Sequence, residues 1–281
     1  MITTDFLSAL DRFNLVVSKR VTSKYSGARP STFTGRGQTI SDHRIYAWGD
    51  DFRLINWRIY ARTDNLYIKK YEEEKNMVVH LIIDSSASMN YGKTKKFDYA
   101  AMIGVGFAYL AMKSNEKFRF ATFSDELKMF QPKRGMSHLA DMVEHLNAMK
   151  PKGKSNFLDA IKQYRKALGT RALIVLVSDF LYDPEEIASA LRLLGEQDIK
   201  VVQVLAETEK KLSISGDITL HDSESKTVLR TFISPSLKNT YLQMLEEHSA
   251  KLRQNCLQIK ADFYQITTDT PIFDAFYQML K

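Results

Sequence analysis

The sequence contains one cysteine, Cys256, among its 281 residues. An intramolecular disulfide is therefore impossible, and a zinc site built from several thiolates is excluded. The longest mostly apolar stretch, residues 100–112, is too short to cross a bilayer. The N-terminal stretch has polar breaks and lacks the basic start, apolar run and cleavage site of a signal peptide. We therefore expect a cytoplasmic protein without a membrane span.

Nucleotide-binding motifs are also missing. Gly35-x-Gly37 lacks the other glycines of a dinucleotide site, and no Gly-x-x-x-x-Gly-Lys-Ser/Thr phosphate loop occurs. The 40 Lys and Arg exceed the 33 Asp and Glu, for a net charge of +7, but they form no dense basic run. Binding to nucleic acid or to an anionic membrane is an alternative that the charge leaves open. We expect a solvated surface and no nucleic-acid partner.

From residue 77 onward, short apolar runs alternate with amphipathic stretches, as in strand and helix units around a largely parallel sheet. The predicted strands are residues 77–83, 118–123, 127–131, 172–180, 199–205 and 261–266. The predicted helices are residues 97–112, 138–149, 157–168, 183–197, 237–256 and 272–280. The expected fold class is α/β with a doubly wound, mostly parallel sheet.

Two regions interrupt this alternation. Residues 1–75 begin with an amphipathic helix over 1–17 and continue in a segment rich in Gly, Arg and aromatic residues. Residues 212–233 contain two alternating runs around the turn DSESKT, which predicts a β-hairpin. We expect the N-terminal segment to pack with this hairpin as a small β-rich appendage on a domain formed by residues 76–281.

Oxygen-bearing side chains follow the first predicted strand, in the order Asp84, Ser86, Ser88. Ser155 lies in a turn before a helix, and Asp179 ends another apolar strand. Ligands of open α/β sheets bind where the carboxyl ends of strands and the loops converge, so these side chains are expected to meet. Mg²⁺ prefers such oxygen ligands. Ordinary helix capping by Ser and Asp is the alternative.

The order Asp-x-Ser-x-Ser, then a hydroxyl residue in a loop, then Asp after an apolar strand resembles the metal-ion-dependent adhesion site of von Willebrand factor type A domains. Ser155 stands where that family usually has Thr. The resemblance implies that Asp84, Ser86, Ser88, Ser155 and Asp179 hold Mg²⁺, or Mn²⁺ or Ca²⁺, with Asp179 binding directly or through water. It also implies a non-enzymatic interaction module in which a partner's Asp or Glu completes the metal shell.

The stretch RIYAWGDDFRLINWRIYARTDNLYIKKYEEE resembles the signature of a bacterial family called domain of unknown function 58. The matching positions are Arg44, Tyr46, Gly49, Asp50, Asp51, Arg53, Ile55, Asn56, Trp57, Ala61 and Arg62. Asn56 replaces the usual Asp, and an Asn can still accept hydrogen bonds there. The resemblance covers nearly the whole chain. It implies a partnership with a MoxR-type AAA+ ATPase, or with its client, in a chaperone-like or regulatory assembly.

We expect structural roles for the signature residues. Arg53, Arg58 and Arg62 are predicted to pair with the acids of the Gly-Asp-Asp turn and so to fasten the appendage. Trp48 and Trp57 are predicted to be packing anchors.

An enzyme is the rival interpretation of the candidate site. A phosphohydrolase would use Asp84 as its nucleophile together with Mg²⁺. Such enzymes usually carry a second acid two residues later, and position 86 is Ser.

Overall fold

The computed structural model describes residues 2–21, 39–72, 77–169, 172–212, 214, 216–223 and 227–280. The chain forms two compact units. One comprises Met1–Val17 with Met77–Lys281, and we call it the sheet unit. The other comprises Ser18–Asn76 and contains the whole signature stretch RIYAWGDDFRLINWRIYARTDNLYIKKYEEE, so we call it the signature unit.

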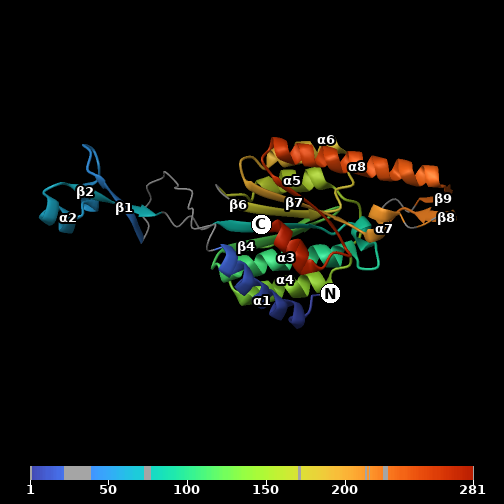
Figure 1. Ribbon diagram of the computed structural model, residues 1–281, viewed down its shortest axis with the longest axis horizontal. Coiled ribbons are helices and arrows are strands. Elements are labelled where there is room, and N and C mark those ends of the chain that lie inside the picture. Colours follow the sequence, from blue (N-terminus) through green and yellow to red (C-terminus); the bar gives the residue numbers. More distant parts are fainter. Residues whose placement is uncertain are drawn as a thin grey trace. The chain divides into compact units, whose positions relative to one another are not determined.

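The sheet unit is built on a six-stranded sheet (Figure 1). Its strands are β3 (Val78–Asp84), β4 (Lys117–Phe123), β5 (Leu127–Met129), β6 (Ala172–Ser178), β7 (Asp198–Leu205) and β10 (Asp262–Thr267). They lie in the order β10-β7-β6-β3-β4-β5, and all neighbours are parallel except β5, which runs antiparallel to β4. The expected fold class, α/β with a doubly wound and mostly parallel sheet, is confirmed.

Helices cover both faces of this sheet (Figure 1). One face packs against α1 (Thr4–Val21), α3 (Lys96–Lys113), α4 (Met136–Ala148) and α9 (Ile272–Met279). The other packs against α5 (Phe157–Arg165), α6 (Pro184–Leu193) and α8 (Pro235–Gln258). Successive side chains of a strand point to opposite faces, so Leu81 and Ile83 enter the first core and Ile82 enters the second.

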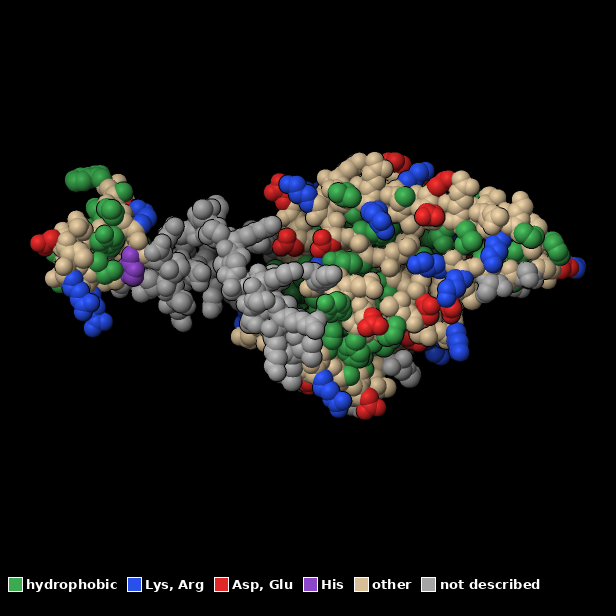
Figure 2. Space-filling view, in the orientation of Figure 1, with side chains coloured by type: hydrophobic (Ala, Val, Ile, Leu, Met, Phe, Trp, Pro, Cys, Tyr) green, Lys and Arg blue, Asp and Glu red, His purple; other side chains and the backbone are tan. Residues whose placement is uncertain are grey.

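The predicted hairpin is confirmed as β8 (Gly216–His221) paired antiparallel with β9 (Val228–Ile233). Val228, Leu229 and Phe232 are exposed on it. Figure 2 shows hydrophobic side chains at the surface at this end of the sheet unit. Two short elements of the sheet unit were not predicted: η2 (Ala87–Asn90), a 3₁₀ turn after β3, and α7 (Glu207–Lys211), which leads from β7 toward the hairpin.

The signature unit has two antiparallel strands, β1 (Thr39–Ile45) and β2 (Tyr67–Glu72). Between them lie η1 (Phe52–Leu54), a 3₁₀ turn, and α2 (Trp57–Thr63). The expected β-rich element therefore also contains helix. Asn56 caps α2, because its side chain accepts a hydrogen bond from the Arg58 backbone N–H at 3.2 Å.

The predicted grouping of the first helix with the rest of residues 1–75 is wrong, because the structure places it in the sheet unit. Ile2, Phe6 and Leu10 are buried in the core of the sheet unit, and Asn147 of α4 exchanges two 3.0 Å hydrogen bonds with the Ile2 backbone. Burial of this apolar face explains why α1 belongs with the sheet. The predicted packing of the signature segment against the hairpin stays a prediction. No helix in the described ranges is long and apolar enough to cross a membrane.

Candidate metal centre

The candidate site lies where β3 and β6 end side by side. β3 pairs in parallel with β6 on one side and with β4 on the other. The chain leaves β3 through α3 toward β4 and leaves β6 through α6 toward β7, so the connections diverge at this point of the sheet. Such a switch point opens a crevice at the carboxyl ends of the strands. Asp84 is the last residue of β3, and Asp179 follows the last residue of β6.

The loop before α5 brings Ser155 to the same edge. Its backbone is held against the end of β3 by hydrogen bonds from Lys152 N–H to the Ser85 carbonyl and from Ala87 N–H to the Gly153 carbonyl, both at 3.0 Å. Gly153 has φ +84, and a Cβ there would come within 2.0 Å of the Asp125 carboxylate. Glycine therefore permits the close approach of this loop.

The five predicted ligands come together. The Ser86 and Ser88 hydroxyl oxygens lie 3.1 Å apart. Ser88 donates a hydrogen bond to Asp179 Oδ2 at 2.8 Å. Ser155 donates to Asp84 Oδ2 over 3.4 Å. These contacts form two groups, Ser86–Ser88–Asp179 and Ser155–Asp84, and the Ser86 backbone N–H connects them by donating to Asp84 Oδ1 at 2.8 Å.

Helix capping does not account for the serines. Ser86 is the residue before η2, yet its hydroxyl makes no capping hydrogen bond. The following helix α3 is preceded by Lys95 and has no side-chain cap either. Both serine hydroxyls are directed into the site instead, and the alternative of simple capping loses its support.

Asp84 is completely buried. Burial raises the pKa of its carboxyl group, and the neighbouring charge of Asp179 raises it further. Hydrogen bonds from Ser178, Tyr182 and the Ser86 N–H act in the opposite direction. A cation at this position would relieve both the burial cost and the repulsion between the two carboxylates.

Two hydroxyl groups at the site were not anticipated. Ser178 donates to Asp84 Oδ2 at 2.7 Å, and the Tyr182 hydroxyl donates to the same oxygen. The Tyr182 and Ser155 hydroxyl oxygens lie 2.6 Å apart. Burial first, and then the charges of Asp84 and Asp179, raise the pKa of Tyr182 well above its ordinary value, so it stays a neutral donor. Ser178 could have been found as the last residue of a strand, but nothing in the sequence marks Tyr182.

A buried lysine was also missed. Lys96, the first residue of α3, donates to Asp179 Oδ2 at 2.8 Å and to Glu209 Oε1 of α7 at 2.7 Å. Burial opposes its charge, but the adjacent Asp179 and Glu209 raise the pKa of its ammonium group. Lys96 therefore stays positively charged beside the predicted ligands.

The residues fit a hard divalent cation. Neighbouring ligands of an octahedral Mg²⁺ ion bound at ~2.1 Å lie ~3.0 Å apart. The oxygen separations of 2.8, 3.1 and 3.4 Å between the predicted ligands are close to this spacing. Within the described ranges, no cluster of three His, Cys, Asp or Glu side chains suits a metal. The candidate centre depends on serine hydroxyls beside two carboxylates, a donor set suited to Mg²⁺ rather than Zn²⁺.

The signature residues form their own contacts in the signature unit. Among the described residues, no ion pair joins Arg53, Arg58 or Arg62 to these acids, and Asp50 pairs with Arg44, at 2.7 and 2.9 Å. The Asp51 side chain accepts from the Arg53 backbone N–H, and Gly49 takes φ +102 in the turn. The Tyr46 backbone N–H donates a hydrogen bond to the Leu66 carbonyl at 2.8 Å.

The two signature tryptophans are not buried within the signature unit. Trp48 is fully exposed there and Trp57 is 60% exposed, so they do not anchor a core of that unit by itself. The edge of the Trp57 ring meets Tyr60 at 6.1 Å between ring centres.

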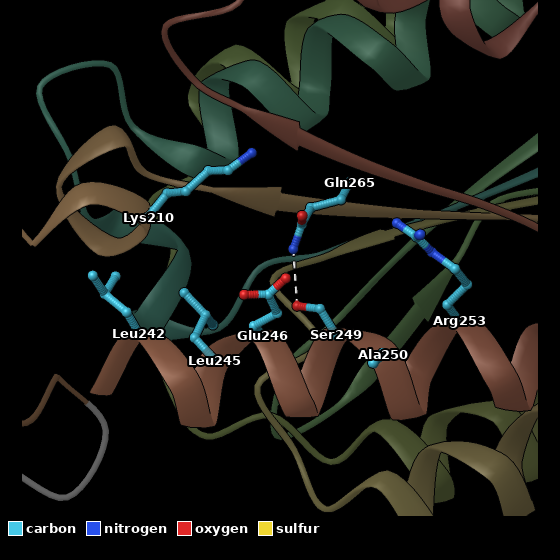
Figure 3. A pocket seen from close by; sticks show the side chains of 8 residues that line it. All are labelled: Lys210, Leu242, Leu245, Glu246, Ser249, Ala250, Arg253 and Gln265. Atoms are coloured by element: carbon cyan, nitrogen blue, oxygen red, sulfur yellow. Dashed lines mark hydrogen bonds between the residues drawn. The ribbon is translucent and has the colours of Figure 1, made fainter. Parts of the chain in front are cut away.

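A separate pocket of about 390 Å³ lies beside α8. Figure 3 shows Lys210 of α7, Glu246 of α8 and Gln265 of β10 around the same hollow. Gln265 donates a hydrogen bond to Ser249 at 2.8 Å on its floor. None of the five predicted metal ligands lines this pocket.

Comparison with known proteins adds a relative and two solved structures. The "Uncharacterized protein Rv1480" of Mycobacterium tuberculosis is 23% identical over 268 residues, covering 93% of this chain and 84% of its own. The crystal structure of conserved hypothetical protein BatB from Bacteroides thetaiotaomicron aligns with a TM-score of 0.43, 11% identity, and coverage of 72% of this chain and 96% of its own. The vWF domain of the type V pili tip protein Mfa5 from Porphyromonas gingivalis aligns with a TM-score of 0.40, 14% identity, and coverage of 73% and 94%.

The family is assigned by a sequence model. Residues 42–251 match the model described as "Protein of unknown function DUF58". This range includes the whole signature stretch, all five predicted metal ligands and both strands of the hairpin. The chain therefore belongs to the DUF58 family.

Proposed function

We propose that this protein is a non-enzymatic interaction module that holds a divalent cation and uses it to bind a carboxylate of a protein partner. Mg²⁺ is the first candidate, and Mn²⁺ and Ca²⁺ are alternatives. The observation that carries the proposal is the convergence of serine and aspartate oxygens from β3, β6 and the α5 loop at the spacing of an octahedral shell.

The five residues would contribute two kinds of metal ligand. Asp84 and Asp179 supply the negative charge, and the hydroxyls of Ser86, Ser88 and Ser155 supply neutral oxygens. A bound cation would supply a positive charge that attracts the partner's Asp or Glu side chain. The buried position of Asp84 strengthens this attraction, because charges interact more strongly where water is excluded.

A MoxR-type AAA+ ATPase, or its client, is the partner that we propose. The support is the similarity of the signature and of the rest of the chain to the DUF58 family. The absence of a possible intramolecular disulfide, with Cys256 as the single cysteine, suits a reducing compartment such as the cytoplasm.

The phosphohydrolase alternative has less support. The Asp84 carboxylate accepts hydrogen bonds from Ser178, Tyr182 and the Ser86 backbone, and its side chain is fully buried. A nucleophile must reach its substrate, and an acid or base must be within hydrogen-bond distance of the reacting group. Ser86 also occupies the position of the second acid.

The test is capture of the purified MoxR-type ATPase of the same organism on immobilised protein. Capture in Mg²⁺ should fall at least tenfold when a chelator is added, and equally in an Asp84→Ala variant. Asp159→Ala, an exposed position on α5, is the matched control and should behave as wild type. Unchanged capture with chelator and with Asp84→Ala would overturn the proposal.

A further inference from the structure

Lys96 is the one buried lysine or arginine among the described residues, and its side chain is only 1% exposed. A buried ammonium group is costly unless partners compensate its charge. It also stands in the first turn of α3, where the helix dipole disfavours a positive charge. Its contacts with Asp179 and Glu209 offset both costs, and they place the ammonium group directly at the candidate centre.

Lys96 holds an oxygen that the candidate metal would also use. Asp179 Oδ2 accepts hydrogen bonds from both Lys96 Nζ and Ser88 Oγ, each at 2.8 Å. Asp179 Oδ1 faces the other way, toward the Leu181 N–H at 3.4 Å. An ion seated between Ser88 and Asp179 would therefore approach the oxygen that the ammonium group holds.

The second partner of Lys96 connects the site to α7. One carboxylate oxygen of Glu209 accepts a hydrogen bond from Lys96 at 2.7 Å, and the other accepts one from the Ala206 backbone N–H at 2.8 Å. The second contact caps the start of α7. Lys96 therefore connects Asp179, at the end of β6, with Glu209 of the short helix α7. Lys210, the residue after Glu209, lines the pocket of Figure 3.

We propose that Lys96 is an internal counter-ion that competes with the divalent cation for Asp179 and transmits occupancy of the site to α7. This inference rests on the proposed metal site. Without the cation, Lys96 holds Asp179 and Glu209 together. When the cation binds, the ammonium group is repelled from Asp179 Oδ2, and the capping end of α7 loses its fixed position.

The charges in the cluster support competition. Asp84, Asp179 and Glu209 contribute three negative charges, and Lys96 contributes one positive charge. Replacing Lys96 with a neutral residue removes the only positive charge within hydrogen-bond distance of Asp179 among the described residues. The site should then attract a divalent cation more strongly.

The first test is calorimetric titration of Mn²⁺ into chelator-treated wild type, Lys96→Met and Lys96→Arg. Methionine keeps the length and loses the charge, while arginine keeps the charge. Lys96→Met should bind Mn²⁺ at least tenfold more tightly than wild type, and Lys96→Arg within about threefold of it. Lys200→Met, which removes an ion pair with Asp262 away from the site, is the control and should leave affinity unchanged.

The second test needs only wild type, so it holds even if Lys96→Met does not fold. Hydrogen exchange at the Lys210 and Leu212 amides, which donate to the Ala206 and Thr208 carbonyls at the start of α7, should quicken at least threefold when Mn²⁺ is added. Exchange that is unchanged by bound Mn²⁺ would overturn the coupling.

The outcomes separate the two proposals. If wild type binds Mn²⁺ and Lys96→Met binds it equally or more weakly, the counter-ion role is wrong and the metal site stands. If Lys96→Met binds Mn²⁺ and wild type does not, the counter-ion role stands and the metal-dependent function of the native chain is wrong. If no variant binds, both are wrong.

Discussion

At the scale of single residues, the two buried aspartates of the site are stabilised in different ways. Asp179 has the ammonium group of Lys96 as a counter-charge. Among the described residues, the hydrogen-bond donors to Asp84 are neutral groups, including Ser178 and Tyr182. A bound cation would therefore stabilise the carboxylate of Asp84 more than that of Asp179. Replacement of Asp84 should weaken metal binding most.

Part of this site could be predicted from the sequence. Asp84 and Asp179 each follow an apolar run, and the carboxyl ends of parallel strands meet at one edge, so their proximity follows from the strand pattern. Lys96 could not be predicted, because it closes a polar stretch, GKTKK, that is typical of a solvated surface. Its burial depends on Glu209, which is distant in the sequence and comes close only in the fold.

His80 makes stability depend on pH. It is buried in β3 with Nδ1 2.7 Å from the Tyr164 hydroxyl, and burial first and then the charge of Arg119 lower its pKa to about 4. The unfolded chain takes up the proton near the ordinary value of 6.5, so protonation favours unfolding. Neutral His80 therefore costs no stability above pH 6.5. As the pH falls from 6.5 toward 4, the free energy of unfolding should fall by roughly 3 kcal/mol, at about 1.4 kcal/mol per pH unit.

Urea unfolding between pH 4 and 8 measures this dependence. The free energy of unfolding of wild type should fall below pH 6.5, and His80→Gln should lose part of that slope. His138 and His145 also have pKa values lowered by burial, so some slope should persist in the variant. Identical slopes in both proteins would contradict the role of His80.

At the scale of the elements, the packing of α3 against α9 requires glycine. A Cβ at Gly106 would lie 1.9 Å from the Phe276 ring, and the ring is fully buried. Alanine normally stabilises the interior of a helix by about 1 kcal/mol relative to glycine. The clash reverses the sign, because a buried aromatic ring has nowhere to move.

Gly106→Ala should therefore lower the free energy of unfolding by about 1–3 kcal/mol, as overpacked cores do, measured by urea unfolding. Gly104→Ala is the matched control on the same helix. Its Cβ would meet the flexible end of Ile83 at 2.6 Å, so its cost should be smaller. A Gly106→Ala protein as stable as wild type would show that α9 is not seated on α3.

The longer helices and strands were predictable, and the short polar elements were not. The buried strand β6 and the amphipathic α5 have clear periodicities of apolar residues. The five residues of α7, ETEKK, have none, and the helix depends on the cap by Glu209. The helix predicted over 183–197 ends at Leu193, since Gly195 takes φ +70.

At the scale of the whole molecule, residues from both ends of the chain complete one core. Phe13 of α1 lies 5.5 Å from Phe273 and 6.0 Å from Phe276 of α9, measured between ring centres. The amphipathic pattern predicted α1, but an apolar face does not specify what it packs against. The sequence pattern therefore predicts the helix correctly but not its place in the sheet unit.

The central claim is that one divalent cation binds where β3, β6 and the α5 loop meet. Calorimetric titration of Mn²⁺ into chelator-treated wild type, Asp84→Asn and Asp159→Asn tests it most directly. Wild type and Asp159→Asn should each bind one ion per chain, and Asp84→Asn should bind it at least tenfold more weakly. No binding to wild type, or equal binding to Asp84→Asn, would contradict it.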